Sequence, residues 1–201
     1  YTYRLKFKLR QIMRYFIGNW KMFGVPKSIN ILNKINSHYS KDKNRSKYRV
    51  IITPPYTLIE SYSRYFKNKK ILIGSQNCYQ KDNYSSNTAA ISPYMLKSVG
   101  AKYTLVGHSD NRSEGDSDTM LKDKVRYALK NNLKVVFCIG ENKIEKKNKK
   151  TLFVLKKQLT KVLEKKFNKN NIIVAYEPIW SIGTGKIPTE NELKKTTIHI
   201  K

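Results

Sequence analysis

The stretch that decides the fold is residues 171–188, NIIVAYEPIWSIGTGKIP. Residues 172–176 are an almost uninterrupted apolar and β-branched run, which is typical of a strand buried on both faces of a parallel sheet. One carboxylate, Glu177, follows at the carboxyl end of this run. Pro178 comes next and keeps Glu177 out of the helical backbone region. The sequence therefore predicts an acid held at the end of a buried strand.

A bulky apolar and glycine-rich segment follows that acid. Trp180 and Ile182 supply apolar cover, while Gly183 and Gly185 can act as hinges and present backbone N–H groups to an anion. An acid at a strand end followed by such a tail indicates a catalytic base under a lid. The plainer interpretation is a buried strand that ends in a surface glutamate and a turn.

The segment AYEPIWSIGTGK resembles the catalytic-glutamate segment and closing lid of the triosephosphate isomerase family. The resemblance implies that Glu177 is the catalytic base and that Gly183 meets the substrate phosphate. The lid that it implies consists of Pro178, Ile179, Trp180, Ser181, Ile182, Gly183, Thr184, Gly185 and Lys186.

Strand-like and helix-like patterns alternate outward from this stretch. Further strands are predicted at residues 15–22, 48–55, 71–79, 103–108 and 135–141, and helices at 25–39, 57–66 and 149–167. A last helix is expected to begin at Thr189, because Glu192 three residues on gives capping-box spacing. This alternation predicts an α/β fold, a TIM (β/α)₈ barrel of which six βα units are present.

The length of 201 residues falls short of the roughly 250 that such a barrel usually has. We expect residues 15–201 to form a TIM barrel that is incomplete at the C-terminus, as a piece of a longer chain or as a barrel that does not close. In the family, the turns after strands seven and eight hold the substrate phosphate. The resemblance therefore implies that these 201 residues alone bind a phosphate-bearing analogue poorly.

Two polar residues end the first predicted strand, YFIGNWKM. Asn19 and Lys21 stand two apart, so on a strand their side chains would point the same way. A lysine supplies a point charge for a phosphate, and an asparagine supplies a directional donor. The resemblance implies that both residues contact the substrate and take part in catalysis.

The fourth predicted strand ends in the motif GHSDNR, where the family has Gly-His-Ser-Glu-Arg-Arg. The resemblance implies that His108 polarises the substrate carbonyl, that Ser109 contacts the substrate and that Asp110 pairs with Lys21. Aspartate is one methylene shorter than glutamate, which withdraws the carboxylate by roughly 1.5 Å unless the backbone moves. We therefore expect a slower enzyme than is usual for the family, unless Asn111 and a shorter loop compensate.

Residues 80–91 form a long polar loop, and compact domains rarely keep such loops without a use. In the family this loop reaches into the partner subunit, which implies a homodimer formed through the loop around Thr88. The glycine and glutamate that normally follow the threonine are replaced by Ala89 and Ala90. If the glycine had a left-handed backbone, alanine adopts it at a cost of about 1 to 2 kcal/mol.

The composition is strongly basic, with 41 Lys and Arg against 14 Asp and Glu and a formal net charge of +27. Such a surplus is typical of a nucleic-acid or surface-binding protein. Drift toward AT-rich codons at solvated positions explains it as well, and we expect no specific nucleic-acid partner. The helix at 149–167 could lie on a membrane, although an outer barrel helix is the plainer interpretation. No apolar run approaches the roughly 20 residues that span a bilayer, so no membrane partner is expected.

The remaining residues give three smaller expectations. Cys78 and Cys138 lie in apolar runs and are predicted to be reduced core residues, with Cys138 supporting the site, rather than a disulfide or metal site. His38 is expected on the surface. Residues 1–14 are basic and contain no acidic residue. This composition fits the tail of a targeting segment, and it also fits a basic terminus with no targeting role. Cytoplasm and a plastid-like organelle both remain open as the location.

The resemblance implies a triosephosphate isomerase, which interconverts dihydroxyacetone phosphate and D-glyceraldehyde 3-phosphate by proton transfer through an enediolate. It implies neither a metal nor an organic cofactor. The catalytic set would be Glu177, His108, Lys21 and Asn19, with a triose phosphate as the small-molecule partner. The alternatives from other classes are an inactive incomplete barrel and a basic nucleic-acid or surface-binding protein.

Overall fold

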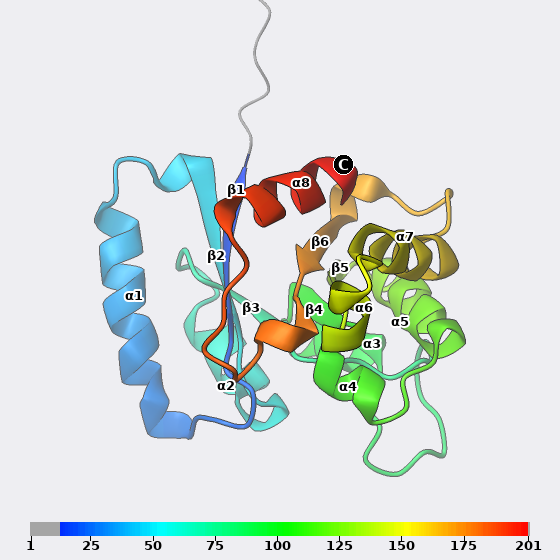
Figure 1. Ribbon diagram of the computed structural model, residues 1–201. Helices are drawn as coiled ribbons and strands as arrows, with labels where there is room; N and C mark the ends of the chain where they lie inside the picture. The colour runs from blue at the N-terminus through cyan, green and yellow to red at the C-terminus, as the bar shows by residue number, and fades with distance from the viewer. Residues whose placement is uncertain (1–12, 201) are drawn as a thin grey trace, which may run out of the picture.

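The computed structural model describes residues 13–200 and contains one six-stranded parallel sheet whose strands follow the order of the chain (Figure 1). The expected basic extension, residues 1–14, lies almost entirely outside the described residues. The strands are β1 (Arg14–Asn19), β2 (Tyr48–Thr53), β3 (Leu72–Ser75), β4 (Tyr103–Val106), β5 (Lys134–Ile139) and β6 (Ile172–Tyr176).

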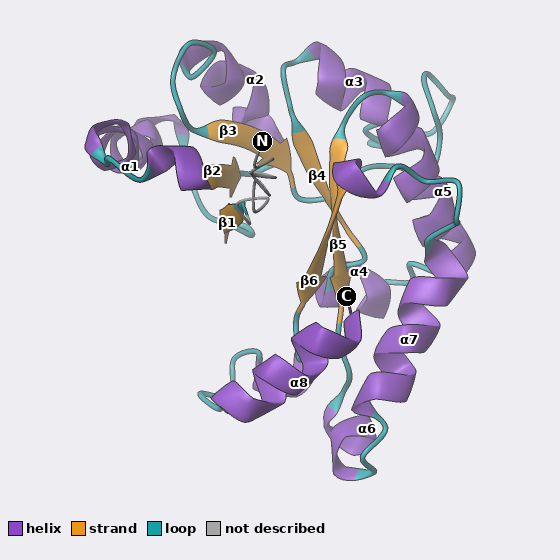
Figure 2. Cartoon of the chain, turned by 90° about the horizontal axis from the view of Figure 1, so that it is seen from above, coloured by secondary structure: helices purple, strands orange, loops and turns teal. Residues whose placement is uncertain are grey.

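The strands curve into an arc with helices on its outer side, as seen from above in Figure 2. The α-helices are α1 (Ile29–Lys41), α2 (Tyr56–Tyr65), α3 (Pro93–Ser98), α4 (Ser109–Ser113), α5 (Asp118–Lys130), α6 (Lys143–Lys147), α7 (Thr151–Val162) and α8 (Glu190–Ile200). Within the described residues β1 pairs only with β2, and β6 only with β5. The prediction of six βα units of a TIM barrel is confirmed.

Side chains alternate along the strands and so build two separate apolar layers. The larger layer lies between the sheet and the helices and includes Ile52 of β2, Phe137 of β5 and Leu155 of α7. The smaller layer faces the inside of the arc and is formed by Ile51, Tyr103, Leu105 and Val136, with Ile17, Leu72, Ile173 and Ala175 packed against it. On β6, Ile173 and Ala175 thus point inward. Because side chains on a strand alternate, Glu177, two residues further on, points inward as well.

The first strand is shorter than predicted, and this corrects the expected placement of Lys21. β1 ends at Asn19, and Lys21 lies in a turn with a left-handed backbone, φ 51°. The Asn19 side chain accepts a hydrogen bond from the Lys21 N–H at 2.9 Å, which turns the chain locally. The two residues are therefore not neighbours on one strand face, although both stay at the carboxyl end of β1.

The lysine-rich stretch after β5 also differs from its prediction. A five-residue helix, α6, precedes α7, and α7 is shorter than the predicted 149–167. Asn142 begins α6 with a capping box that is completed by Glu145. The predicted capping box of α8 is confirmed, since the N–H of Thr189 donates to Glu192 at 2.8 Å and the Glu192 N–H donates back at 3.3 Å.

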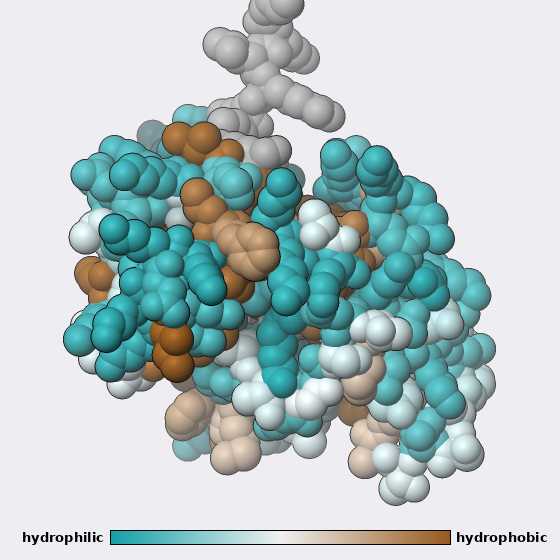
Figure 3. Space-filling view, turned by 45° about the vertical axis from the view of Figure 1, so that its right-hand side comes forward, coloured by the Kyte–Doolittle hydropathy of each residue, from teal (hydrophilic) through white to brown (hydrophobic). Residues whose placement is uncertain are grey.

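The smaller structural expectations are met. Cys78 and Cys138 are buried free thiols, and His38 is exposed. Of the helices in residues 13–200, none is both long enough and apolar enough to span a membrane. The face shown in Figure 3 is mostly hydrophilic, with separate hydrophobic patches.

Candidate active site

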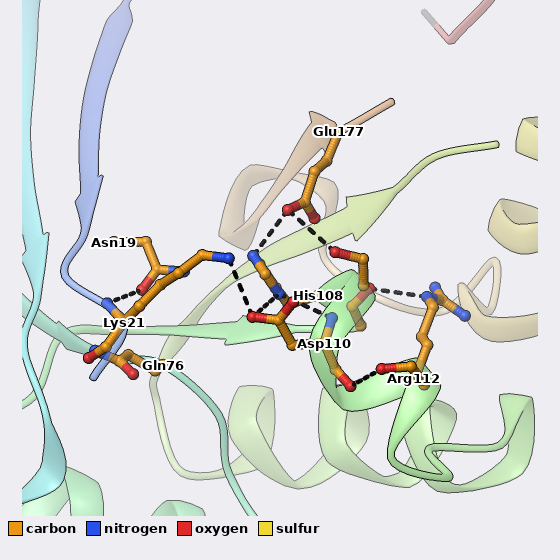
Figure 4. Close-up of polar contacts among 10 residues, drawn as sticks. Asn19, Lys21, Gln76, His108, Asp110, Arg112 and Glu177 are labelled. Carbon is orange, nitrogen blue, oxygen red and sulfur yellow. Dashed lines mark hydrogen bonds and ion pairs between the residues drawn. The ribbon is translucent and has the colours of Figure 1, made fainter. Parts of the chain in front are cut away.

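Three side chains meet at the carboxyl ends of β4 and β6. Nε2 of His108 lies 2.8 Å from Oε1 of Glu177, and the Ser109 hydroxyl lies 3.4 Å from the same oxygen (Figure 4). The His108 side chain is only 9% exposed and that of Glu177 is 22% exposed. Carboxyl ends of parallel strands are the edge where α/β barrels carry their chemistry. Residues far apart in the sequence thus form one half-buried acid–imidazole pair.

The hydrogen bonds of His108 define which ring nitrogen carries the proton. Its Nδ1 accepts the backbone N–H of Asp110 at 3.2 Å, at the first turn of α4. A nitrogen that accepts a hydrogen bond carries no proton, so the neutral ring holds its proton on Nε2. Nε2 therefore donates to Glu177, and the same N–H is available to any acceptor that replaces the carboxylate.

Lys21 is held from several directions. Its Nζ lies 3.1 Å from Oδ2 of Asp110, which confirms the predicted pairing. Gln76 donates through Nε2 to the carbonyl oxygens of Lys21 at 2.8 Å and Thr53 at 2.9 Å. Together with the bond from Lys21 N–H to Asn19, these contacts fix a left-handed backbone that is unusual for lysine. The ammonium thus reaches Asp110, beside His108, from the turn that follows β1.

Arg112 supports the turn that carries His108. Its Nε donates to the carbonyl oxygen of Gly107 at 2.8 Å and its Nη2 to that of Cys138 at 3.2 Å. Gly107 has φ +77°, a backbone conformation that is strained for any other residue, and a Cβ there would also lie 3.1 Å from the Cys138 carbonyl oxygen. Burial lowers the pKa of the Arg112 guanidinium. Burial, with repulsion from Glu177, raises the pKa of the Cys138 thiol to about 12, so this thiol is uncharged at neutral pH.

The segment predicted as the lid begins with a 3₁₀ turn, Ile179–Ser181, and continues into an exposed loop. Gly183 and Gly185 both have left-handed backbones, with φ 69° and 70°. The Trp180 indole donates to Oε1 of the buried Glu141 at 2.9 Å, and the Tyr176 hydroxyl donates to the same oxygen at 3.0 Å. Burial, with the charge of Glu141, raises the pKa of Tyr176, which remains a neutral donor. The base of the segment is fixed and its glycine-containing part is exposed.

The structure brings most of the predicted site residues together. Asn19, Lys21, His108, Ser109, Asp110 and Glu177 share the carboxyl edge of the sheet (Figure 4). Within residues 13–200, no hydrogen bond joins the predicted phosphate contact Gly183 to this group. Thr88 lies on a separate exposed loop. No cluster of His, Cys, Asp and Glu able to hold a metal ion occurs in the described part of the chain.

Several contributing residues were not predicted to belong to the site. Gln76 holds the Lys21 turn, Glu141 holds Trp180, and Gly140 lies against the backbone of Glu177. The only sequence signal was their position at strand ends, in the runs ILIGSQNCY and VVFCIGE. Their partners lie far away in the sequence, so the contacts become visible only in the folded chain.

Comparisons with known proteins agree on one family. The family model described as "Triosephosphate isomerase" matches residues 14–201. The triosephosphate isomerase of Bartonella henselae is 37% identical over 183 residues, covering 90% of this chain and 71% of that protein. Its counterpart from Leptospira interrogans is 35% identical over 190 residues, covering 92% of this chain and 74% of that protein. The enzyme from the yeast Yarrowia lipolytica is 36% identical over 180 residues.

The folds agree as well as the sequences. The crystal structure of the Bartonella henselae triosephosphate isomerase superposes with a TM-score of 0.83 at 33% sequence identity. The superposition covers 93% of this chain and 73% of that one. The acid–imidazole pair, the lid sequence and the parallel half-barrel are thus found in a chain that is similar to the triosephosphate isomerases of these three organisms. The chain belongs to the triosephosphate isomerase family.

Proposed function

We propose that this protein interconverts dihydroxyacetone phosphate and D-glyceraldehyde 3-phosphate, with Glu177 as the base and His108 as a neutral electrophile. The observation that carries the proposal is the 2.8 Å contact between His108 Nε2 and Glu177 Oε1. It places a proton acceptor and an N–H donor side by side at a half-buried strand edge. Isomerisation of a hydroxy-ketone needs this pair, because a proton leaves carbon while charge develops on the carbonyl oxygen.

The chemical steps follow from that pair. The substrate carbonyl oxygen replaces the carboxylate as the acceptor of the His108 Nε2–H. Glu177 then takes the proton from the hydroxyl-bearing carbon next to the carbonyl, and the C–H electrons form the enediolate. The hydroxyl proton passes to the former carbonyl oxygen, where His108 stabilises the charge in transit. Glu177 returns its proton to the neighbouring carbon, which gives the aldehyde and restores the carboxylate.

Lys21 and Asn19 assist by positioning and charge. The Lys21 ammonium, held against Asp110 at 3.1 Å, supports binding of an anionic substrate and the developing oxyanion. Asn19 serves as a directional donor and also fixes the Lys21 turn through its side-chain oxygen. Ser109, 3.4 Å from Glu177, supports the resting position of the carboxylate and contacts the substrate.

The segment from Pro178 to Lys186 acts as the lid, with the backbone N–H of Gly183 meeting the phosphate. Support comes from the left-handed glycines in an exposed loop and from a base pinned by the Trp180–Glu141 bond. Such loops close over bound substrate and exclude water from a reactive intermediate. The contact of Gly183 with phosphate belongs to the closed state.

We infer further that two copies associate through the loop around Thr88. This loop is closed at its base by a bond from Tyr79 N–H to the Ile91 carbonyl at 2.9 Å, while Thr88 and Tyr84 are exposed. An exposed loop with a fixed base is suited to enter a partner. Sedimentation velocity at several protein concentrations tests this, and a monomer at every concentration would contradict it.

A coupled assay tests the reaction itself. The purified protein is given either triose phosphate, and formation of the other is followed beside the His108→Asn variant. We expect turnover in both directions and a fall of about 10² to 10⁴ in kcat for the variant, the range for a lost acid–base group. No turnover of either triose phosphate by the folded parent protein would refute the proposal.

A further inference from the structure

Gly140, the residue after β5, lies against the backbone of the proposed base. A Cβ built on Gly140 would lie 1.8 Å from the carbonyl oxygen of Glu177 and 2.7 Å from its carbonyl carbon. Real side chains do not approach backbone atoms so closely, so any other residue at this position would displace Glu177. The glycine is required here because two segments of the backbone approach each other closely.

Two backbone hydrogen bonds hold this approach in place. The N–H of Glu177 donates to the carbonyl of Ile139 at 2.7 Å, and the N–H of Ile179 donates to the carbonyl of Glu141 at 3.1 Å. Gly140 is the residue between these two acceptors. The backbone that carries the Glu177 carboxylate therefore takes its position from the backbone around Gly140.

Gln158, on the outer helix α7, fixes Gly140 from the other side. Its Oε1 accepts the N–H of Gly140 at 2.9 Å, and its Nε2 donates to the carbonyl oxygen of Gly140 at 2.9 Å. One amide side chain thus satisfies both backbone groups of one residue. At neutral pH an amide offers both a donor and an acceptor here without carrying a charge, whereas an ionised carboxylate offers acceptors alone.

We propose that Gln158 is a positioning residue for Glu177, acting through the backbone of Gly140. The inference rests on the proposed role of Glu177 as the base. The chain of contacts runs from α7 through Gly140 to the carboxylate that lies 2.8 Å from His108. Misplacement of a reacting group by about 1 Å can cost on the order of 10²-fold in rate. An outer-helix side chain thereby influences proton transfer without touching the substrate.

Two variants and a control test this in the purified protein. Gln158→Ala removes both bonds to Gly140, and we expect kcat to fall about 10- to 100-fold with KM changed less than about threefold. Gln158→Glu keeps the acceptor but loses the donor while it is ionised. Lys157→Ala, an exposed neighbour on the same helix, is the control and should match the parent.

The pH profile separates positioning from a structural role. On acidification the new carboxyl of Gln158→Glu gains a proton and can again donate to the Gly140 carbonyl. We expect its kcat, as a ratio to that of the parent at the same pH, to rise as pH falls toward 5. A flat ratio, or a kcat equal to that of the parent at neutral pH, would overturn the proposal. Gln158→Glu decides the matter even if Gln158→Ala does not fold.

A crystal structure of Gln158→Glu at neutral pH keeps this inference distinct from the proposed reaction. We expect the contact between Glu177 Oε1 and His108 Nε2 to lengthen from 2.8 Å. An unchanged contact overturns the inference whether or not the protein isomerises triose phosphates. A parent protein without turnover overturns the proposed reaction, while the geometry of the variant still reports on Gln158.

Discussion

Lys21 and Asp110 form an ion pair across the mouth of the half-barrel, with Nζ and Oδ2 3.1 Å apart. The shorter side chain of aspartate therefore makes the pair with Lys21 that the resemblance implied. Asp110 lies in the first turn of α4, where its N–H also bonds His108 Nδ1. Asp110 thus contacts both Lys21 and His108 from the start of one helix.

We accordingly expect Asp110→Glu to lower kcat/KM modestly, because the extra methylene must be accommodated in a contact that is already made. Asp110→Asn, which removes the charge, should lower kcat/KM about tenfold by releasing Lys21. Both side chains are about half exposed, so the free energy of unfolding should change by less than about 1 kcal/mol. Steady-state kinetics test this expectation. A higher kcat/KM for Asp110→Glu would show that the shorter acid holds the Lys21 charge too far from the substrate.

Ala89 has a left-handed backbone, with φ 62°, in the loop proposed to form the dimer contact. We expect Ala89→Gly to raise the free energy of unfolding by up to about 1 kcal/mol, because glycine adopts this conformation without strain. Ala90→Gly is the matched control and should lower the stability by about 0.5 to 1 kcal/mol through backbone entropy alone. Urea unfolding at one fixed protein concentration compares them. Equal losses in both variants would argue against strain at Ala89.

Glu192 links α8 to α6, because its carboxylate pairs with Lys146 of α6. The same carboxylate accepts the backbone N–H of Thr189 at the start of α8. These partners, Lys146 first, lower the pKa of Glu192 from 4.5 to about 2. A carboxyl whose pKa is lower in the folded state adds stability above its unfolded pKa and loses it as pH falls from 4.5 toward 2. Its side chain is 40% exposed, so the contribution stays below about 1 kcal/mol.

We therefore expect Glu192→Gln to melt below the parent at pH 6 and to match it near pH 3. Glu190→Gln serves as control, because Glu190 is 81% exposed and, among residues 13–200, forms an ion pair only with Lys194 four residues on. Melting temperatures at the two pH values give the comparison. A difference for Glu192→Gln that persists at pH 3 would show that the charge of this residue is not its cause.

The strand order and the placement of Glu177 and His108 at one edge of the sheet could be predicted from the sequence, for identifiable reasons. β6 has the predicted bounds because five apolar, mostly β-branched residues stand between polar ones and Pro178. Glu177 and His108 follow strands, and parallel strands bring their carboxyl ends to one edge. The close match of their motifs to one family supplied the roles that strand pattern alone does not give.

The features that the sequence did not predict depend on long-range contacts or on weak local signals. The left-handed turn at Lys21 is stabilised by Gln76, 55 residues away, and no local glycine marks it. Helix α6 has no apolar periodicity, and the Asn142–Glu145 capping box was its one available signal. The Gln158–Gly140 contact joins a helix face to a strand end, which no periodicity reveals.

Proton transfer by Glu177 is the central claim, and exchange with solvent measures it most directly. The protein is incubated with dihydroxyacetone phosphate in deuterated water, and deuterium bound to carbon in substrate and product is followed by NMR. We expect the parent to incorporate deuterium during isomerisation and folded Glu177→Gln to incorporate it at least about 10³-fold more slowly, because the proton acceptor is gone. Incorporation by Glu177→Gln at the parental rate would contradict the account.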